Sequence, residues 1–179
     1  MSLLSKSPAL AAALFAPALL GLAACGPAMK SQPKPADVQA GQAFLAANAK
    51  DPAVHTLSDG LEFKVLASGD PGGPHPRPQD EVKVNYEGRL LGPANAPLTG
   101  QVFDSSFARG VPADFPLAGL VPAWVEALQL MRPGDEWMLY VPSKLAYGDD
   151  PPPGGPIPPG AVLIFRIQLL GVLQHDGPQ

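Results

Sequence analysis

Two segments in the middle of the chain alternate between apolar and polar residues. In residues 61–69, "LEFKVLASG", Leu61, Phe63 and Val65 are separated by charged side chains, and residues 81–91, "EVKVNYEGRLL", repeat the pattern. Because successive side chains of a strand point to opposite faces, this period of two predicts strands with one buried face. This part of the chain therefore favours a sheet that rests on a core.

Two later segments, residues 135–142 and 161–172, are apolar at almost every position. They read "DEWMLYVP" and "AVLIFRIQLLGV", which is typical of strands that are covered on both faces. In the second segment Phe165 and Ile167 share one face, and Arg166 lies on the other. These segments are predicted to be the central strands of the sheet.

One internal helix is predicted before these central strands, in "VPAWVEALQLM". Val121, Trp124 and Leu128 are spaced by three and four residues and fall on one helix face. Pro122 suits the first turn, and the pair Pro133–Gly134 ends the helix. Strands, one internal helix and turns rich in Pro and Gly predict an α+β domain, an antiparallel sheet curled over the helix.

A further helix is predicted ahead of the sheet, over residues 36–50. Phe44 and Leu45 lie among alanines, Asp37 is a suitable N-cap, and Pro52 stops the helix soon after its end. Because the apolar face is narrow, we expect this N-terminal helix to rest on the domain that follows.

Composition and charge narrow the range of functions. The chain has 179 residues with 12 basic and 16 acidic side chains, a formal net charge of -4 and no basic cluster, so no nucleic acid partner is expected. Ser105 and Ser106 have no histidine motif nearby, which disfavours a serine hydrolase. Metal-ligand spacings and phosphate-binding loops are not found, and we expect neither a metal nor a cofactor. No ligand role is assigned to three scattered histidines, His55, His75 and His175.

The first residues of the chain have the character of an export signal. Lys6 precedes the apolar run "PALAAALFAPALLGL", which is shorter than a membrane-spanning helix, and "LAAC" then ends at Cys25, the sole cysteine. This resembles a bacterial lipoprotein signal, so residues 1–24 are interpreted as a lipoprotein signal peptide and Cys25 as its lipid attachment site. An ordinary signal peptide that contains a cysteine is the alternative. We expect an extracytoplasmic protein anchored by acyl chains such as palmitate, on the periplasmic side of either membrane or at the cell surface, with residues 25–35 as a flexible tether.

Several motifs then follow one another in an order that a known family shares. They read "VNYEGRL", "GQVFDSSFARG", "FPLAGLVPAWVEALQLMRPGDEWMLYVPSKLAYG" and "IPPGAVLIFRIQLL". Over roughly residues 55–173 they resemble the FKBP-type peptidyl-prolyl cis-trans isomerases, in particular the bacterial branch that includes the macrophage infectivity potentiators. The resemblance implies a twisted antiparallel sheet wrapped around one short helix, with an apolar pocket between them, and assigns residues 51–175 to the isomerase domain.

The resemblance also implies which side chains line this pocket. Catalytic roles fall to Asp104, Tyr147 and Phe165. Asp104 would either hold the pocket's tyrosine or face the twisting carbonyl carbon, and we favour the first role because a buried carboxylate needs donors. The implied substrate-binding residues are Tyr86, Phe103, Phe115, Leu120, Val121, Trp124 and Ile157.

Residues 149–159, "DDPPPGGPIPP", are typical of a stiff linker when taken alone. The run lies between Tyr147 and Phe165, however, which the resemblance places in one pocket. We therefore interpret it as a loop overhanging that pocket. Relatives often carry a histidine or another polar residue in this loop, and an aliphatic residue at the position of Pro156.

The activity that the resemblance implies is rotation of X–Pro peptide bonds in exported proteins. Amide resonance sets a barrier of about 18–20 kcal/mol. No bond breaks, so a catalyst needs an apolar slot for the proline ring and a surface that fits the twisted amide better than the planar one. Proline-containing polypeptides and unfolded exported proteins are the expected partners, and macrolide inhibitors of the family are candidate ligands. Two alternatives are a proline-binding chaperone module with little turnover and a structural surface lipoprotein with a filled pocket.

Overall fold

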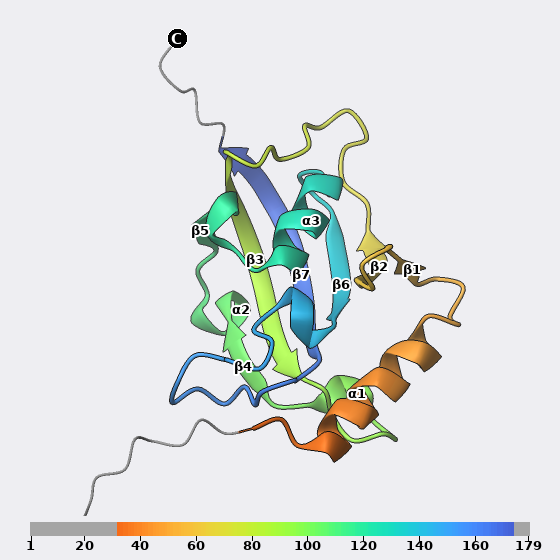
Figure 1. The fold of residues 1–179 in the computed structure, drawn as a ribbon. Coiled ribbons are helices and arrows are strands. Elements are labelled where there is room, and N and C mark those ends of the chain that lie inside the picture. Colours follow the sequence, from red (N-terminus) through yellow and green to blue (C-terminus); the bar gives the residue numbers. More distant parts are fainter. Residues whose placement is uncertain (1–31, 174–179) are drawn as a thin grey trace, which may run out of the picture.

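The computed structural model describes residues 32–173 (Figure 1). The predicted signal peptide 1–24, Cys25 with its predicted lipid, and most of the predicted tether 25–35 lie outside the described residues. The elements along the described chain are α1 (Pro35–Asn48), β1 (His55–Thr56), β2 (Glu62–Ala67), β3 (Glu81–Leu90), η1 (Pro97–Thr99), β4 (Val102–Ser105), α2 (Ser106–Arg109), β5 (Ala113–Pro116), η2 (Leu117–Gly119), α3 (Pro122–Leu130), β6 (Glu136–Val141), η3 (Ser143–Leu145) and β7 (Leu163–Leu173).

The described strands form one seven-stranded antiparallel sheet in the order β1-β2-β6-β7-β3-β4, with β5 paired to β3. Strand β7 lies between β6 and β3, and Phe165 on β7 is the register partner of Leu139 on one side and Gly88 on the other. Figure 1 shows α3 crossing one face of this sheet. The predicted α+β fold is confirmed, and so is the central position of β6 and β7.

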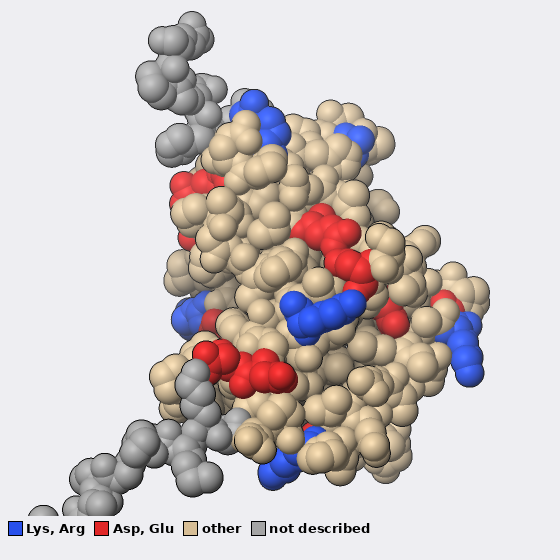
Figure 2. All heavy atoms as spheres, in the orientation of Figure 1, with Lys and Arg blue, Asp and Glu red and all other residues tan. Residues whose placement is uncertain are grey.

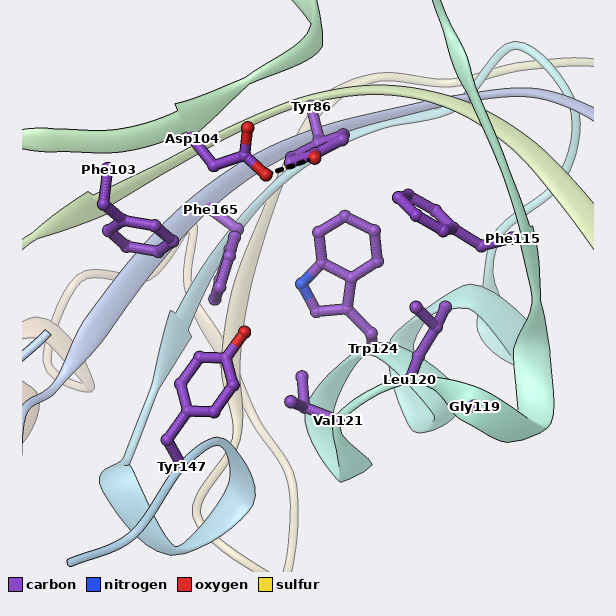
Figure 3. Close-up of a pocket in the computed structure, with 10 residues that line it drawn as sticks. All are labelled: Tyr86, Phe103, Asp104, Phe115, Gly119, Leu120, Val121, Trp124, Tyr147 and Phe165. Carbon is purple, nitrogen blue, oxygen red and sulfur yellow. Dashed lines mark hydrogen bonds between the residues drawn. The ribbon is translucent and has the colours of Figure 1, made fainter. Parts of the chain in front are cut away.

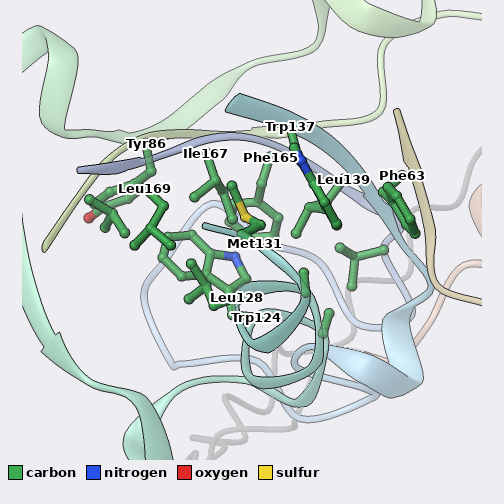
Figure 4. Close-up of a cluster of buried hydrophobic side chains, with 14 of the residues drawn as sticks. Phe63, Tyr86, Trp124, Leu128, Met131, Trp137, Leu139, Phe165, Ile167 and Leu169 are labelled. Carbon is green, nitrogen blue, oxygen red and sulfur yellow. The ribbon is translucent and has the colours of Figure 1, made fainter. Parts of the chain in front are cut away.

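Side chains of α3 pack against side chains of the sheet and together form the main core of the domain (Figure 4). Val121 is its N-cap and Pro122 occupies the first turn, where the missing N–H of proline costs no hydrogen bond. Trp124, Ala127 and Leu128 are buried against the strands. Truncating a fully buried leucine to alanine costs about 2–5 kcal/mol, so the Leu128 contact alone is a large part of the stability of such a domain.

The alternate side chains of β6 and β7 form a second cluster with α1. Tyr140 and Ile164 are buried in it, and Phe44 of α1 packs against Tyr140 with 5.8 Å between ring centroids. Gly41 allows a close approach, because a Cβ atom there would lie 2.7 Å from Cγ2 of Val162. This second cluster explains why the two central strands are apolar on both faces.

Helix α1 spans Pro35–Asn48, and the prediction that Asp37 is its N-cap is wrong. Lys34 is the N-cap residue and makes no side-chain capping hydrogen bond, whereas Asp37 lies in the first turn. Pro35 explains the earlier start, because its fixed φ suits the first helical position. The Asp37 carboxylate still interacts favourably with the N-terminal end of the helix dipole.

Glu62 at the start of β2 is a carboxylate only 3% exposed to solvent. The amide of Asn48, at the end of α1, donates a hydrogen bond of 2.7 Å to its Oε2 atom. Burial raises the pKa of Glu62, and the hydrogen bond from Asn48 offsets part of this effect. The pair connects the last turn of α1 to the sheet.

Candidate functional site

A pocket of about 310 Å³ opens between the sheet and the N-terminal end of α3 (Figure 3). Aromatic rings from several strands surround it, and aliphatic side chains that lead into α3 complete its wall. The residues that line it are Tyr86, Phe103, Asp104, Phe115, Gly119, Leu120, Val121, Trp124, Tyr147 and Phe165. The pocket therefore brings together every implied site residue except Ile157, and adds Gly119.

Three neighbouring strands carry one wall of the pocket. Gly88 on β3 is the register partner of Asp104 on β4 and of Phe165 on β7, so these side chains point to the same face as Tyr86, two residues earlier. A Cβ atom at Gly88 would lie 2.6 Å from the Phe103 ring and 2.8 Å from the Phe165 ring. Glycine thus leaves the space that these two rings occupy.

A β-bulge explains how two consecutive residues of β4 line the same pocket. The register passes from Gly88 opposite Asp104 to Arg89 opposite Val102, which leaves Phe103 as the extra residue. A bulge of this kind re-aims a side chain that regular alternation would send to the other face. Phe103 and Asp104 therefore both reach the pocket.

The other wall comes from β5, η2 and the start of α3. Trp124, in the first turn of α3, is the centre of the aromatic set: its ring meets Tyr86 at 5.2 Å and 81°, and Phe165 at 5.4 Å and 86°. Phe103 in turn meets Phe165 at 5.7 Å and 87°. Edge-to-face contacts of this kind add stability beyond burial, so the rings support one another as a preformed apolar surface.

The indole N–H of Trp124 is buried without a hydrogen-bond partner among the described residues. Figure 3 shows its nitrogen on the side of the ring that faces Phe165 and Tyr147. The Trp124 and Phe165 rings are nearly perpendicular, at 86°, with 5.4 Å between their centroids. The floor of the pocket is thus an aromatic ring with one hydrogen-bond donor that no described residue satisfies.

The polar side of the pocket is a network of three residues. The Tyr86 hydroxyl donates a hydrogen bond of 2.5 Å to Oδ2 of Asp104. Arg109 donates to Oδ1 of Asp104 and, at 2.9 Å, to the Tyr86 hydroxyl, and its guanidinium lies 5.5 Å from the centre of the Tyr86 ring. Of the two roles considered for Asp104, this geometry matches the one in which it holds a tyrosine.

Arg109 was not among the residues singled out from the sequence. It follows Asp104 in the motif "FDSSFARG", at the end of the short helix α2. The Ser105 hydroxyl caps this helix by accepting a hydrogen bond from the Ala108 N–H, and one turn later the arginine returns to the aspartate. A basic residue five positions after the aspartate, in the same short motif, is the available signal.

The network sets the protonation of the pocket's polar groups. Burial acts to raise the pKa of Asp104, but the hydrogen bonds from Tyr86 and Arg109 outweigh it and hold that pKa below its ordinary value. Burial and then the hydrogen bond to Asp104 raise the pKa of Tyr86, and burial followed by the charge of Asp104 raises that of Tyr147. At neutral pH the pocket thus holds an ionised Asp104 and two neutral tyrosines, and the Tyr147 hydroxyl points into it (Figure 3).

Ile157 does not line the pocket. It is partly buried and packs against the main core cluster, from within the proline-rich loop that runs between η3 and β7. The loop forms a long open turn that overlaps β4, at the edge of the sheet, in the view of Figure 1. Because the loop begins beside Tyr147, which lines the pocket, it borders the pocket, and Ile157 packs against a core cluster that shares Trp124 and Phe165 with the pocket.

Charged groups on the surface give little indication of a polyanionic partner. Figure 2 shows Lys, Arg, Asp and Glu side chains scattered over one face, with wide uncharged areas between them.

Among residues 32–173, no group of three or more His, Cys, Asp or Glu side chains is placed to hold a metal ion. Within the same range, no helix has both the length and the apolar character needed to cross a membrane.

Known proteins share both the sequence and the fold. A family model described as FKBP-type peptidyl-prolyl cis-trans isomerase matches residues 72–170. "Peptidyl-prolyl cis-trans isomerase Mip" of Coxiella burnetii is 49% identical over 131 residues, which cover 73% of this chain and 53% of the relative. "Outer membrane protein MIP" of Legionella longbeachae is 42% identical over 132 residues, covering 74% and 52%. The chain thus spans about half the length of these curated relatives.

A solved structure extends the likeness to three dimensions. The crystal structure of a peptidyl-prolyl cis-trans isomerase from Pseudomonas syringae pv. tomato is 35% identical and superimposes with a TM-score of 0.67, over 79% of this chain and 97% of that one. The family model covers more than half of the chain, and it spans the strands and the helix that build the pocket. The chain therefore belongs to the FKBP-type peptidyl-prolyl cis-trans isomerase family, close to its Mip branch.

Proposed function

We propose that this protein is a peptidyl-prolyl cis-trans isomerase that accelerates rotation about X–Pro bonds without a covalent intermediate. The observation that carries the proposal is the open pocket of about 310 Å³ floored by Trp124 and walled by aromatic rings. A proline ring is apolar and compact, and such a pocket offers it a preformed surface of aromatic and aliphatic side chains. The family to which the chain belongs supports the same activity.

The chemistry follows from the electronic structure of the amide. A planar amide is stabilised by resonance and is more polar than a twisted one, in which the nitrogen has regained its lone pair. A pocket that excludes water disfavours the planar form more than the twisted form. Bringing the amide beside Trp124, Phe165 and Tyr86 therefore lowers the rotational barrier, and the catalyst need not transfer a proton or form a bond.

Polar groups at the edge of the pocket orient the peptide. The neutral Tyr147 hydroxyl points into the pocket and is a donor for a carbonyl of the bound segment. The backbone N–H of Val121, which leads into α3, is a second donor. Asp104 fixes the Tyr86 ring through its hydrogen bond and thereby shapes the slot, and Arg109 keeps the carboxylate ionised.

A protease-coupled assay on a short X–Pro peptide tests the proposal. Phe165→Ala and Asp104→Leu are expected to lower kcat/KM by at least tenfold each, because one removes a pocket wall and the other frees the Tyr86 ring. Phe107→Ala is the matched control: this ring lies outside the pocket, beneath Arg166 on the surface, and its loss should leave turnover unchanged. Rates near the uncatalysed value for the wild type, together with tight peptide binding, would instead favour the chaperone module.

We further propose that the protein works outside the cytoplasm, held at a membrane through lipid on Cys25. The motif "LAAC" supports this, as does the name of its Legionella relative, "Outer membrane protein MIP". Its substrates would then be unfolded exported proteins, reached by an isomerase domain of residues 51–175 on the tether 25–35, and macrolides would compete for the pocket. Cys25→Ala should abolish incorporation of labelled palmitate and release the protein from the membrane fraction, whereas continued incorporation would refute the assignment.

A further inference from the structure

The loop of residues 149–159 is itself a proline-bearing peptide on the surface of this protein. Pro152, Pro153 and Pro156 are exposed to solvent, whereas Pro159 at the end of the loop is buried. The loop therefore has an anchored base and a displayed tip. The tip carries the residue type that the pocket is proposed to bind.

Backbone hydrogen bonds close the base of the loop. The N–H of Gly160 donates to the carbonyl of Gly148 at 2.9 Å, and that of Asp150 donates to the carbonyl of Tyr147 at 3.2 Å. Both glycines adopt positive φ, 55° at Gly148 and 74° at Gly160, which side-chain-bearing residues rarely do. The neck is thus fixed by glycine geometry, and the tip projects from it.

A turn and three prolines restrict the conformation of the tip. The N–H of Gly155 donates to the carbonyl of Pro152 at 3.4 Å, and this turn is followed directly by the exposed Gly155–Pro156 bond. Proline fixes φ, so the three prolines of the tip reduce the conformational entropy lost on capture, whereas Gly154 and Gly155 add to that loss. The Gly155–Pro156 bond is therefore presented much as a substrate bond would be.

We propose that the tip of this loop, residues 152–156, binds in the aromatic pocket of a second copy of this chain. The inference rests on the proposed function, because it takes the pocket to accept a proline ring and its preceding carbonyl. The partner copy would place Pro156 against Trp124. The protein would thereby associate through its own active site and limit its own turnover at high local concentration.

The loop cannot be the ligand of its own pocket in the observed fold. Tyr147 lines the pocket and begins the loop, yet none of the prolines at 151–159 is among the lining residues. The hydrogen bonds at the neck hold the two ends of the loop together and restrain the position of the tip. A second molecule is not subject to this restraint.

The loop and the pocket lie next to each other on one surface, an arrangement that allows a symmetric dimer. When a ligand segment and its binding site lie beside each other on one surface, a two-fold axis between two copies allows each tip to enter the other's pocket. Two equal contacts then form at once, and no open edge remains for further copies. The expected product is a dimer, not a fibre.

Sedimentation of the full chain over a wide concentration range tests the idea. The wild type is expected to show a reversible monomer–dimer equilibrium, and its kcat/KM per molecule is expected to fall as its concentration rises. A loop variant, Pro152→Ala with Pro153→Ala and Pro156→Ala, should stay monomeric at every concentration. The matched control, Pro74→Ala with Pro78→Ala, changes exposed prolines of another loop and should dimerise like the wild type.

Mixing two variants provides the sharper measurement. Leu120→Trp fills the pocket and leaves the loop intact, whereas the loop variant leaves the pocket intact. Neither should self-associate, but an equimolar mixture should form a heterodimer through the one remaining loop–pocket contact. Excess of a short X–Pro peptide should dissociate both this heterodimer and the wild-type dimer, which gives a readout that does not depend on any substitution.

The outcomes separate this proposal from the isomerase proposal. A wild type that stays monomeric while it turns over the test peptide would overturn the loop contact alone. Loop-dependent association in a protein without turnover would overturn the isomerase alone. Dimerisation that is lost in the 74/78 control variant, or that persists in the triple loop variant, would show that another surface is responsible.

Discussion

Gly88 and Phe165 are register partners on β3 and β7, and the Phe165 ring occupies the space that a side chain at Gly88 would need. A Cβ atom at Gly88 would lie 2.8 Å from Cε1 of Phe165 and 2.6 Å from Cζ of Phe103. Carbon atoms do not approach so closely without displacement. The two rings that form one wall of the pocket therefore depend on a residue that does not line it.

Gly88→Ala is expected to damage the site more than the fold. The added methyl group must push both rings into the pocket, and small displacements of positioning groups cost up to about 10²-fold in rate. We expect kcat/KM to fall at least tenfold and the free energy of unfolding to drop by about 1–3 kcal/mol, the range typical of overpacking. The X–Pro peptide assay and urea unfolding measure the two effects.

Gly171→Ala is the matched control for this substitution. Gly171 lies on β7, and a Cβ atom there would meet nothing within 4 Å. Turnover and stability should both remain close to the wild type. If Gly88→Ala and Gly171→Ala lost turnover and stability equally, the effect would come from replacing any strand glycine. The contact of Gly88 with the two rings would then not be its cause.

Tyr86→Phe tests the polar network at the edge of the pocket. It removes a hydrogen bond to Asp104, so the pKa of Asp104 should rise toward its ordinary value. A lowered pKa stabilises the fold above the pKa of the unfolded chain, and this stabilisation is lost as the pH falls through the folded value. We expect the variant to lose about 1 kcal/mol at neutral pH and less in acid, with the Asp104 titration followed by carboxyl NMR.

Tyr140→Phe provides the comparison, because Tyr140 is buried in the second cluster, with α1. It should leave the titration of Asp104 unchanged. If Tyr86→Phe also leaves that titration unchanged, Arg109 alone controls the carboxylate.

Glu62→Gln is expected to stabilise the protein at neutral pH. Because burial raises the pKa of Glu62, its contribution to stability is fully present below the pKa of the unfolded chain and is lost as the pH rises through the folded value. Glutamine stays neutral and retains an oxygen acceptor for Asn48. The gain should be about 1 kcal/mol at pH 7 and vanish near pH 4, as measured by urea unfolding at both pH values.

Glu81→Gln, at a partly exposed position on β3, serves as the control for a change of charge. It should shift stability by less than about 0.5 kcal/mol. A Glu62→Gln protein that is less stable than the wild type at pH 7 would show that the charged hydrogen bond to Asn48 outweighs the cost of burial.

For Gly41→Val, helix propensity and packing predict opposite changes in the free energy of unfolding. Valine is a better helix former than glycine, so propensity alone predicts a gain in stability. The close approach of Gly41 to Val162 predicts a loss of about 1–3 kcal/mol and weaker hydrogen-exchange protection of α1. Ala46→Val, at an exposed position of the same helix, should cost no more than about 0.7 kcal/mol. A stabilised Gly41→Val protein would disprove tight docking of α1.

Much of the fold could be predicted from the local pattern of apolar and polar residues, because that pattern agrees with which side chains are buried. The alternation in residues 81–91 matches the one-sided burial of β3, and the apolar run at 161–172 matches β7, which is buried in the middle of the sheet. The helix face with Trp124 and Leu128 is the face that fills the core. The pocket residues came from the order of motifs and not from periodicity.

Several features of the site depend on geometry that no local pattern encodes, even where the resemblance names the residues. Regular alternation sends Phe103 and Asp104 to opposite faces, and only the bulge in β4 brings both to the pocket. Arg109 reaches Asp104 because the helix α2 that carries it is only four residues long, and the sequence pattern does not predict this length. Ile157 lies in a loop without regular secondary structure, so no periodicity indicates whether its side chain lines the pocket.

The position of β7 has a consequence for the order in which the domain can be assembled. Its 11 residues are the last strand of the described chain, yet they separate β3 from β6 at the middle of the sheet. A chain delivered from its N-terminus cannot join the two halves of the sheet until residues 163–173 emerge, and contacts between residues so distant in sequence form slowly. The sheet is therefore completed only by the last described residues, and if the protein is exported as proposed, its chain lacks the finished core until that segment has crossed the membrane.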